Sequence, residues 1–396
     1  MNLFPHEALN ADTSAEPSGL QLSDEHINEK YARGDIRIVT EQARYPLNTV
    51  PAMVSSGDYN LNPEFQRRQR WSPEKQARLV ESFIMNVPIP PIFLYEDRYS
   101  HYEVMDGLQR LTAISEFYED HLMLQGLEEW PELNGRRYSQ LPEQIKRGVD
   151  RRYLSSIILL QETARDAAEA QQLKQLVFER INSGGVQLEP QEARNALYDG
   201  PLNQLCISLA RDRDLCAMWA IPHPEVDSDF SDRALLANER YRRMEDVELV
   251  LRFFAHRQRA SLQRGPLRQY LDTYLKMGNL FPAETLAELQ GLFEATTELV
   301  FETLGEKAFW LWRYRYGSWG WLRRPTTVAY DAIMRVFSLH LDDGKELRAK
   351  ARVAQQGITS FYERHAEDFE ARYTNLTNVR RRDVLMEEFV QDVLAA

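Results

Sequence analysis

The sequence predicts an α+β protein in which a small domain of strands and helices precedes an all-helical domain. From residue 36 to about 200, short apolar runs alternate with helical stretches, whereas from Pro201 onward nearly every segment has the pattern of an amphipathic helix. A chain of 396 residues with 43% hydrophobic and 27% charged residues is also an ordinary globular protein, long enough for two domains. We therefore assign residues 35–200 to the first domain, 201–396 to the second, and 1–34 to a disordered or extended leader.

The elements of the first domain follow from capping residues and apolar patterns. Ser72-Pro73-Glu74 has a capping hydroxyl, a proline at the first helical position and an acid in the first turn, which predicts a helix to about residue 86. The prolines of VPIPPIFLY then turn the chain into an extended segment. The remaining predicted elements are a strand at 101–105, a helix at 111–118, a strand at 155–162 and a helix at 167–180.

The second domain is predicted to contain helices throughout, with no internal repeat. The helical patterns cover residues 244–256, 267–276, 284–304, 326–341, 344–372 and 384–394. The stretch AIPHPEVDSDFSD at 220–232, with two prolines and four acids, predicts a loop.

Charge, hydropathy and cysteine content exclude several classes of protein. A net charge of −12 argues against coating nucleic acid through the overall field, so any DNA contact must be local. No apolar run approaches a membrane span, and the first thirty residues have neither a basic start nor an apolar core, so we expect a cytoplasmic protein. Cys206 and Cys216 form no CxxC pair, which predicts two reduced thiols.

The most informative residues lie where a strand breaks into a helix at an Asp-Gly pair. The run HYEVMDGLQRLTAI places Gly107 at the turn and Arg110 in the first turn of the helix. Helix N-termini attract anions, glycine allows close backbone approach, and arginine can bind phosphate through two donors. The pattern indicates a phosphate site, and its alternative is a plain turn followed by a surface arginine.

Two further segments make this interpretation more specific, NPEFQRRQRW at 62–71 and FERINSGGVQLEPQEARNAL at 178–197. In this order and spacing, the three segments resemble the amino-terminal domain of the GmrSD-type restriction enzymes, a ParB- and sulfiredoxin-like family known as domain of unknown function 262. The resemblance covers roughly residues 35–200 and implies a ParB/sulfiredoxin-like domain with a small mixed sheet. The segment MEDVELVLRFFAHR at 244–257 is similar to the helical continuation common in that family.

The resemblance implies a site for a nucleoside triphosphate and Mg²⁺. The expected catalytic residues are Asp106, Gln109, Arg110 and Arg67. The expected nucleotide-binding residues are Gln66, Arg67, Gly107, Arg110, Arg180, Asn182 and Gly185, and Gly184 and Glu192 complete the family pattern. The expected metal ligands are Asp106 and Glu103. Leu108 departs from the family's DGQQR box by replacing its first glutamine, which puts hydrolysis or nucleotide choice in doubt. The structural alternative is that Arg67 and Arg180 pair with acids such as Asp106 and Glu192 and lock three loops together.

The resemblance also implies a role in restricting foreign or modified DNA. Many relatives carry an HNH nuclease at the carboxyl end, but His340 and His365 stand alone on predicted helices, so the chain resembles the standalone form. Three functions follow: an NTP-hydrolysing subunit, a ParB-like DNA nickase that acts by itself, or a non-catalytic nucleotide-switched module for a partner nuclease or HEPN-type protein. Assembly into a homo-oligomer stays open.

The second domain has one unusual segment, KAFWLWRYRYGSWGWLRRP at 307–325, in which aromatic residues alternate with arginines. Such a segment could stack on bases and bind phosphates, or form a hot spot for a protein partner. The structural alternative is interdomain packing with the arginines extending to solvent.

Overall fold

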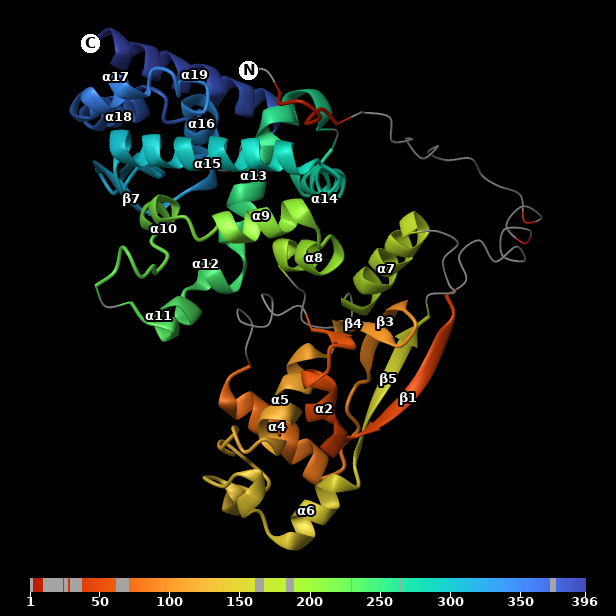
Figure 1. Ribbon diagram of the computed structural model, residues 1–396. Helices are drawn as coiled ribbons and strands as arrows, with labels where there is room; N and C mark the ends of the chain where they lie inside the picture. The colour runs from red at the N-terminus through yellow and green to blue at the C-terminus, as the bar shows by residue number, and fades with distance from the viewer. Residues whose placement is uncertain are drawn as a thin grey trace. The chain divides into compact units, whose positions relative to one another are not determined.

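The chain forms two compact units, Ala15–Leu188 and Met1–Ser14 with Glu189–Ala396, which we call the sheet unit and the helical unit and describe separately (Figure 1). The computed structural model describes residues 3–9, 24, 28, 38–61, 71–160, 167–182, 189–228, 230–263, 265–370 and 375–396.

The described strands of the sheet unit form a mixed five-stranded sheet in the order β1-β5-β3-β4-β2. The strands are β1 (Thr40–Pro46), β2 (Tyr59–Asn60), β3 (Ile92–Arg98), β4 (His101–Asp106) and β5 (Tyr153–Leu159). β1 pairs antiparallel with β5, and β3 antiparallel with β4. β3 runs parallel to β5, and β2 parallel to β4. Strands and helices thus alternate in this unit, and the α+β prediction is confirmed.

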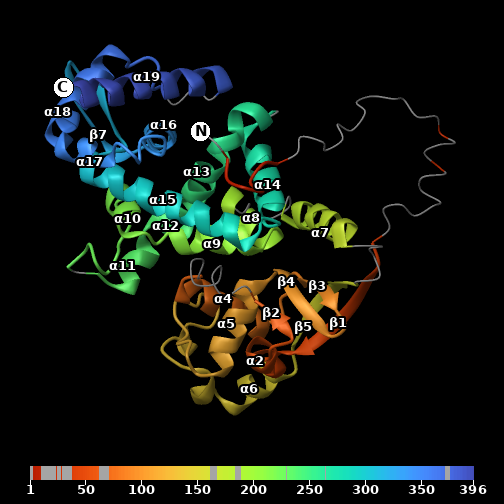
Figure 2. The same ribbon diagram turned by 45° about the horizontal axis from the view of Figure 1, so that its top comes forward.

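In the sheet unit, α2, α4 and α5 cover one face of the sheet, and α7 contacts β4 (Figures 1 and 2). They are α2 (Val50–Ser55), α4 (Pro73–Ile84), α5 (Leu108–Tyr118), α6 (Glu143–Asp150) and α7 (Ala167–Asn182), with short 3₁₀ turns at Leu47–Thr49, Pro131–Leu133 and Tyr138–Gln140. Ser72 caps α4 as predicted, by accepting a hydrogen bond from the Lys75 backbone N–H. Ile92 and Leu94 are fully buried in the core under these helices, so one side of β3 is fixed by apolar packing.

The helical unit packs its helices around α15, which contacts α9, α10, α13, α16, α17 and α18. Its helices are α8 (Pro190–Leu197), α9 (Pro201–Leu209), α10 (Arg213–Trp219), α11 (Asp232–Ala237), α12 (Glu239–Arg242), α13 (Glu245–Leu262), α14 (Leu267–Gly278), α15 (Ala283–Leu304), α16 (Thr327–Phe337), α17 (Gly344–Ala349), α18 (Ala351–Arg364) and α19 (Leu376–Ala395). Trp219, Phe309 and Tyr330 form an aromatic cluster in its core, with ring centroids 5.0 to 5.8 Å apart.

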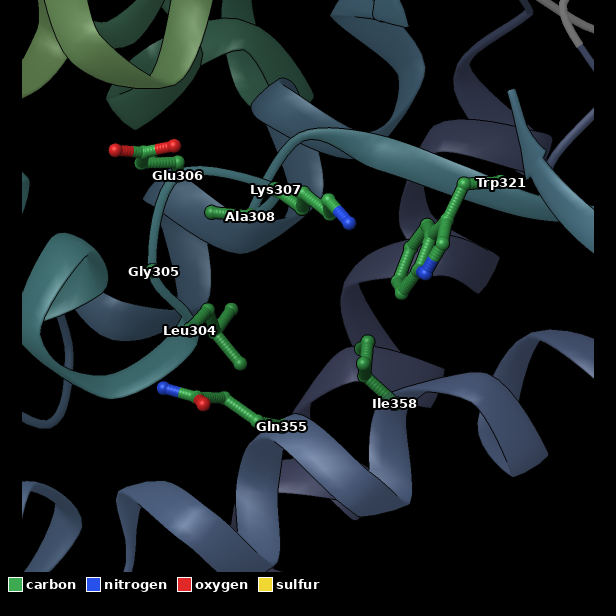
Figure 3. Close-up of a pocket in the computed structure, with 8 residues that line it drawn as sticks. All are labelled: Leu304, Gly305, Glu306, Lys307, Ala308, Trp321, Gln355 and Ile358. Atoms are coloured by element: carbon green, nitrogen blue, oxygen red, sulfur yellow. The ribbon is translucent and has the colours of Figure 1, made fainter. Parts of the chain in front are cut away.

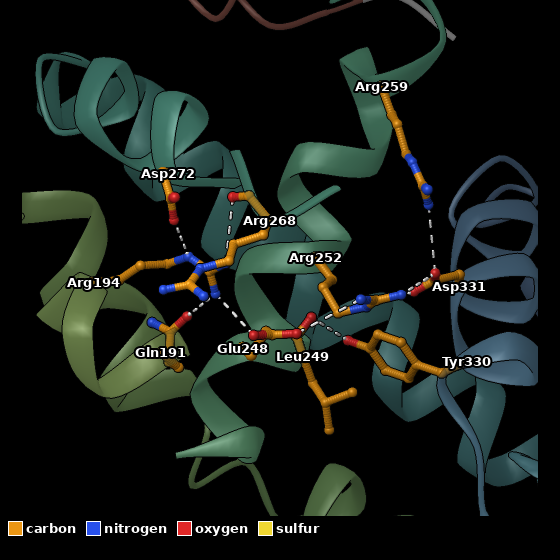
Figure 4. A network of polar contacts seen from close by, with 10 residues as sticks. All are labelled: Gln191, Arg194, Glu248, Leu249, Arg252, Arg259, Arg268, Asp272, Tyr330 and Asp331. Carbon is orange, nitrogen blue, oxygen red and sulfur yellow. Dashed lines mark hydrogen bonds and ion pairs between the residues drawn. The ribbon is translucent and has the colours of Figure 1, made fainter. Parts of the chain in front are cut away.

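A buried polar network runs across this unit from α8 through α13 to α16 (Figure 4). The Arg194 side chain is only 2% exposed and pairs with Glu248 at 2.8 Å and with Asp272 at 2.7 Å. On the same helix as Glu248, Arg252 pairs with Asp331 at 2.5 Å. Removing one partner of such a pair leaves a buried charge without compensation, so the network specifies how these helices assemble.

Residues 3–9 are held to the helical unit by a separate buried ion pair. Glu7 is fully buried, and its two carboxylate oxygens accept hydrogen bonds from Arg257 at 2.5 and 2.6 Å. The Phe4 ring lies 4.7 Å from the same guanidinium, and Thr285 donates a hydrogen bond to the Pro5 carbonyl. This corrects the expectation of a disordered or extended leader for residues 3–9, because a single acid in the run LFPHEAL gives no signal of a partner 250 residues away.

The helical unit is not helical throughout, which corrects the expectation of an all-helical second domain. Residues 310–325 form a hairpin of β6 (Trp310–Arg315) and β7 (Ser318–Pro325). The aromatic residues and arginines of this segment alternate with a period of two, which is the strand period. The predicted helix at 344–372 is also divided into α17 and α18, and α18 ends at Arg364.

Candidate functional site

The predicted strand, turn and helix at the Asp-Gly pair are all present, and a β-bulge decides which way Asp106 points. The pairing of β3 with β4 slips by one residue next to Met105. Residues three apart in a regular strand point to opposite faces, but the extra residue of a bulge reverses this relation. Asp106 and Glu103 therefore lie on the same face of the sheet. Their cross-strand partners on the neighbouring strand are Phe93 and Tyr95, respectively.

Gly107 forms the corner between β4 and α5. It serves as the N-cap of α5 with φ of +100°, and as a glycine it has no side chain with which to cap the first turn of this helix. A Cβ atom at this position would lie 2.3 Å from the Cγ2 of Ile92, which is fully buried. Glycine is thus required by the backbone conformation and by packing against Ile92, rather than by an open surface at its Cα.

Arg110 is mostly buried and binds within the turn. Its Nη2 donates to the Asp106 carboxylate at 2.6 Å, and its Nη1 donates to the Pro90 carbonyl at 2.6 Å. The Arg110 side chain is 11% exposed, whereas Asp106 is 39% exposed. Asp106 is therefore the accessible partner, and Arg110 fixes its orientation while joining the turn to the segment before β3.

Gln109 connects the turn to the end of the first predicted segment. Its Oε1 accepts a hydrogen bond from the Trp71 backbone N–H at 3.0 Å. Gln66 and Arg67 themselves lie outside the described residues, so their placement beside the turn stays a prediction. Trp71, the last residue of that segment, is held at the site by this bond, and the Lys75 ammonium lies 4.5 Å from its ring centroid.

Glu103 forms an ion pair that its sequence pattern does not predict. Lys174 of α7 lies 2.5 Å from its carboxylate, and the two side chains are 10% and 22% exposed. Burial is the largest cause that raises the pKa of Tyr95 above its usual value. The negative charges of Asp97 and Glu103 raise this pKa further. Lys174 lies on a predicted helix, but no pattern in a single sequence says which lysine of a helix faces a sheet.

The third predicted segment is only partly described. Arg180 is exposed near the end of α7, whereas the side chain of Asn182 and both Gly184 and Gly185 lie outside the described residues. Glu192 is 1% exposed and accepts a hydrogen bond from the Glu189 backbone N–H at 2.8 Å, in a capping box that begins α8. This contact gives Glu192 a structural role.

Of the two predicted metal ligands, Asp106 fits Mg²⁺ better than Glu103. Among the described residues, no group of three or more His, Cys, Asp or Glu side chains could hold a metal ion. Mg²⁺ commonly binds through one or two carboxylates and takes its other oxygens from water and phosphate. Asp106 fits this role because, among the described residues, its Oδ2 accepts a hydrogen bond from Arg110 and its Oδ1 has no partner, while Glu103 already pairs with Lys174.

These features define a class: an α+β domain with a mixed sheet, whose bulged strand ends in an Asp-Gly-x-x-Arg turn, followed by a helical region. Residues 50–198 match the model of the GmrSD restriction endonuclease, N-terminal domain, so this part of the chain is similar to that family. The resemblance carried by the DGLQR turn and its two companion segments is thereby confirmed. The comparisons found no matching curated protein and no matching solved structure. Within the described ranges, none of the helices has the length and apolarity needed to cross a bilayer.

Proposed function

We propose that this chain is the nucleotide-binding component of a restriction system that acts on foreign or modified DNA. A nucleoside triphosphate with Mg²⁺ binds beside the Asp106 carboxylate in this proposal. The observation that carries it is the combination at one corner of the domain: a half-exposed carboxylate fixed by a buried arginine, next to a helix whose N-cap is a glycine without a capping side chain. Helix N-termini of this kind favour phosphate, and the match to a restriction family supplies the biological setting.

Each residue then has a distinct role. Asp106 holds the metal, which neutralises the nucleotide phosphates and bridges them to the protein. Arg110 is a positioning residue, because both of its described hydrogen bonds lie inside the domain. Gln109 anchors Trp71 and thereby the end of the segment that carries Gln66 and Arg67, which would meet the phosphates directly.

The sharpest test is Asp106→Asn, which keeps an acceptor for Arg110 but removes the negative charge. We expect wild type to bind at least one NTP in the presence of Mg²⁺, and the variant to bind it at least tenfold more weakly. Glu143→Gln is the matched control, since Glu143 and Arg147 form an exposed pair with the same i,i+4 spacing in the same unit. Titration of the four labelled NTPs with and without Mg²⁺ measures this. Equal affinities of wild type and Asp106→Asn, or no saturable binding by wild type, would contradict the proposal.

Hydrolysis is a separate question, and one observation favours a binding module without turnover. Leu108, which replaces the first glutamine of the family's box, is 9% exposed and buried in the domain, so it presents no polar group to a water molecule. Measuring phosphate release beside binding separates the two functions: binding with release supports an NTPase, and binding without release supports a nucleotide switch that controls a partner nuclease. A wild-type protein that nicks supercoiled plasmid with Mg²⁺ but binds no NTP would support the nickase instead.

A further inference from the structure

The β6–β7 hairpin carries an aromatic surface that the nucleotide site does not use. Its two-residue turn, Tyr316-Gly317, has positive φ at both positions, as hairpin turns require. Trp312 pairs with Trp321 across the strands, and Tyr314 pairs with Trp319. Paired residues share a face, so these four rings form one ladder, with edge-to-face contacts at 5.4 and 5.7 Å.

This ladder is exposed to solvent at its outer end. Tyr314 is 61% exposed, and Tyr316 at the tip is fully exposed. Large aromatic rings in such positions gain nothing from burial in the folded monomer, so a cluster of them marks a binding surface.

A cavity of about 340 Å³ lies at the inner end of the ladder (Figure 3). The Trp321 indole points into it, and Ile358 of α18 lies across from the ring. The other lining residues are Leu304, Gly305, Glu306, Lys307, Ala308 and Gln355. One aromatic wall, one aliphatic wall and a lining that includes Glu306, Lys307 and Gln355 suit a flat heteroaromatic ring with polar edges.

The charge of the hairpin selects an anionic partner. Residues 307–325 contain five basic residues and no acid, in a chain whose net charge is −12. Arg313 is used inside the unit, where it donates hydrogen bonds to the Ala366 and Phe369 carbonyls. Arg315, Arg323 and Arg324 are exposed and form no ion pair with any described residue. Their guanidinium groups are therefore available to phosphates.

We propose that the hairpin and its cavity bind an unpaired nucleobase of DNA together with the flanking phosphates. The base stacks on Trp321 in the cavity, while neighbouring bases stack on the outer rings and phosphates contact the exposed arginines. A protein hot spot would combine such rings with an apolar centre, whereas this surface combines them with three exposed arginines that form no ion pair with any described residue. The inference rests on the proposed function only for the choice of DNA as the polyanion.

Two sets of variants test the site with a fluorescein-labelled single-stranded 20-mer and the full-length protein. Loss of one stacking ring in Tyr314→Ala weakens binding about tenfold, and Tyr99→Ala, an 80% exposed tyrosine of the other unit, leaves it unchanged. Arg323→Ala with Arg324→Ala lowers the salt dependence of log Kd by about two, and Arg233→Ala, an exposed arginine on α11, does not. Unchanged affinity and salt dependence in both hairpin variants would overturn the proposal.

The cavity has its own readout, a duplex with 2-aminopurine at a single mismatch. We expect the protein to quench its emission further as the extruded base stacks on the indole, and Trp321→Leu, with its fold checked by circular dichroism, to abolish this change. Equal quenching by both proteins would refute the assignment of the cavity. These experiments contain no NTP, so a failure of the nucleotide site would leave them unaffected. Hairpin variants that lose a co-purifying protein but keep their DNA affinity would overturn the proposal in favour of a protein partner.

Discussion

Replacing Gly107 by alanine tests why the Asp-Gly corner exists. The alanine must adopt the φ of +100° that Gly107 has, which costs an L-residue about 1–2 kcal/mol. It must also displace Ile92, whose Cγ2 and Cβ would lie only 2.3 and 2.8 Å away in a fully packed core. Overpacking of this kind costs about 1–3 kcal/mol, so we expect a total loss of about 2–5 kcal/mol in the free energy of unfolding. Urea unfolding, with an m-value of about 1–3 kcal/mol/M, should show a midpoint lowered by 1 M or more, on the order of the predicted loss divided by m.

Gly135→Ala separates the two contributions within the same unit. Gly135 has φ of +83°, but a Cβ there would meet nothing within 4 Å, so only the backbone term of about 1–2 kcal/mol remains. The excess loss in Gly107→Ala measures the collision with Ile92. In a double-mutant cycle, Ile92→Ala should make Gly107→Ala less costly than it is alone. If the two glycine variants lose equal stability, or if the cycle shows no coupling, the packing explanation of the corner is refuted.

Two further predictions concern buried charges of the helical unit. Burial opposes the charged form of His340, but hydrogen bonds to Asp343 and Glu387, both at 2.8 Å, outweigh it and raise the pKa of this histidine. A raised pKa stabilises the fold fully below the ordinary histidine value of about 6.5, and this contribution disappears as pH rises through the folded pKa. His340→Gln should therefore cost about 1–3 kcal/mol at pH 5.5 and clearly less at pH 9 in urea unfolding, and a pH-independent loss would contradict this. Glu7→Ala leaves Arg257 without its buried partner and should cost about 3–5 kcal/mol, measured the same way; a loss below 1 kcal/mol would show that the pair does not hold residues 3–9 in place.

The sequence predicts the local elements of the site well because their signals are local. The strand predicted at 101–105 runs from His101 to Asp106, and the helix predicted at 111–118 begins three residues earlier, at Leu108. What no local pattern reveals is the bulge at Met105, because pairing registers depend on the neighbouring strand. The purpose of Gly107 is also decided elsewhere in the chain, by the position of Ile92, and the partner of Glu103 is decided by the docking of α7.

The hairpin shows a different limit of sequence reasoning. The segment at 307–325 has the period of a strand, but the helical patterns on both sides of it favour a helical interpretation of the whole region. The division between α17 and α18 is likewise tertiary: Lys350 lies at the break and donates a hydrogen bond to the Leu394 carbonyl at the end of α19. Periodicity predicts that a segment is ordered and amphipathic more reliably than it predicts where a neighbouring element interrupts it.

The salt bridge between Glu7 and Arg257 has a consequence for the order in which the molecule is made. During synthesis Glu7 emerges 250 residues before Arg257. The buried ion pair that Glu7 forms in the folded helical unit therefore has to wait for that arginine. The intervening sheet unit can therefore complete its own core while the acid is still hydrated, and closure of the helical unit has to wait for a long loop to be brought together. Joining the two ends of that loop should be a late step, and refolding experiments on the full-length protein should show that Glu7→Ala removes it.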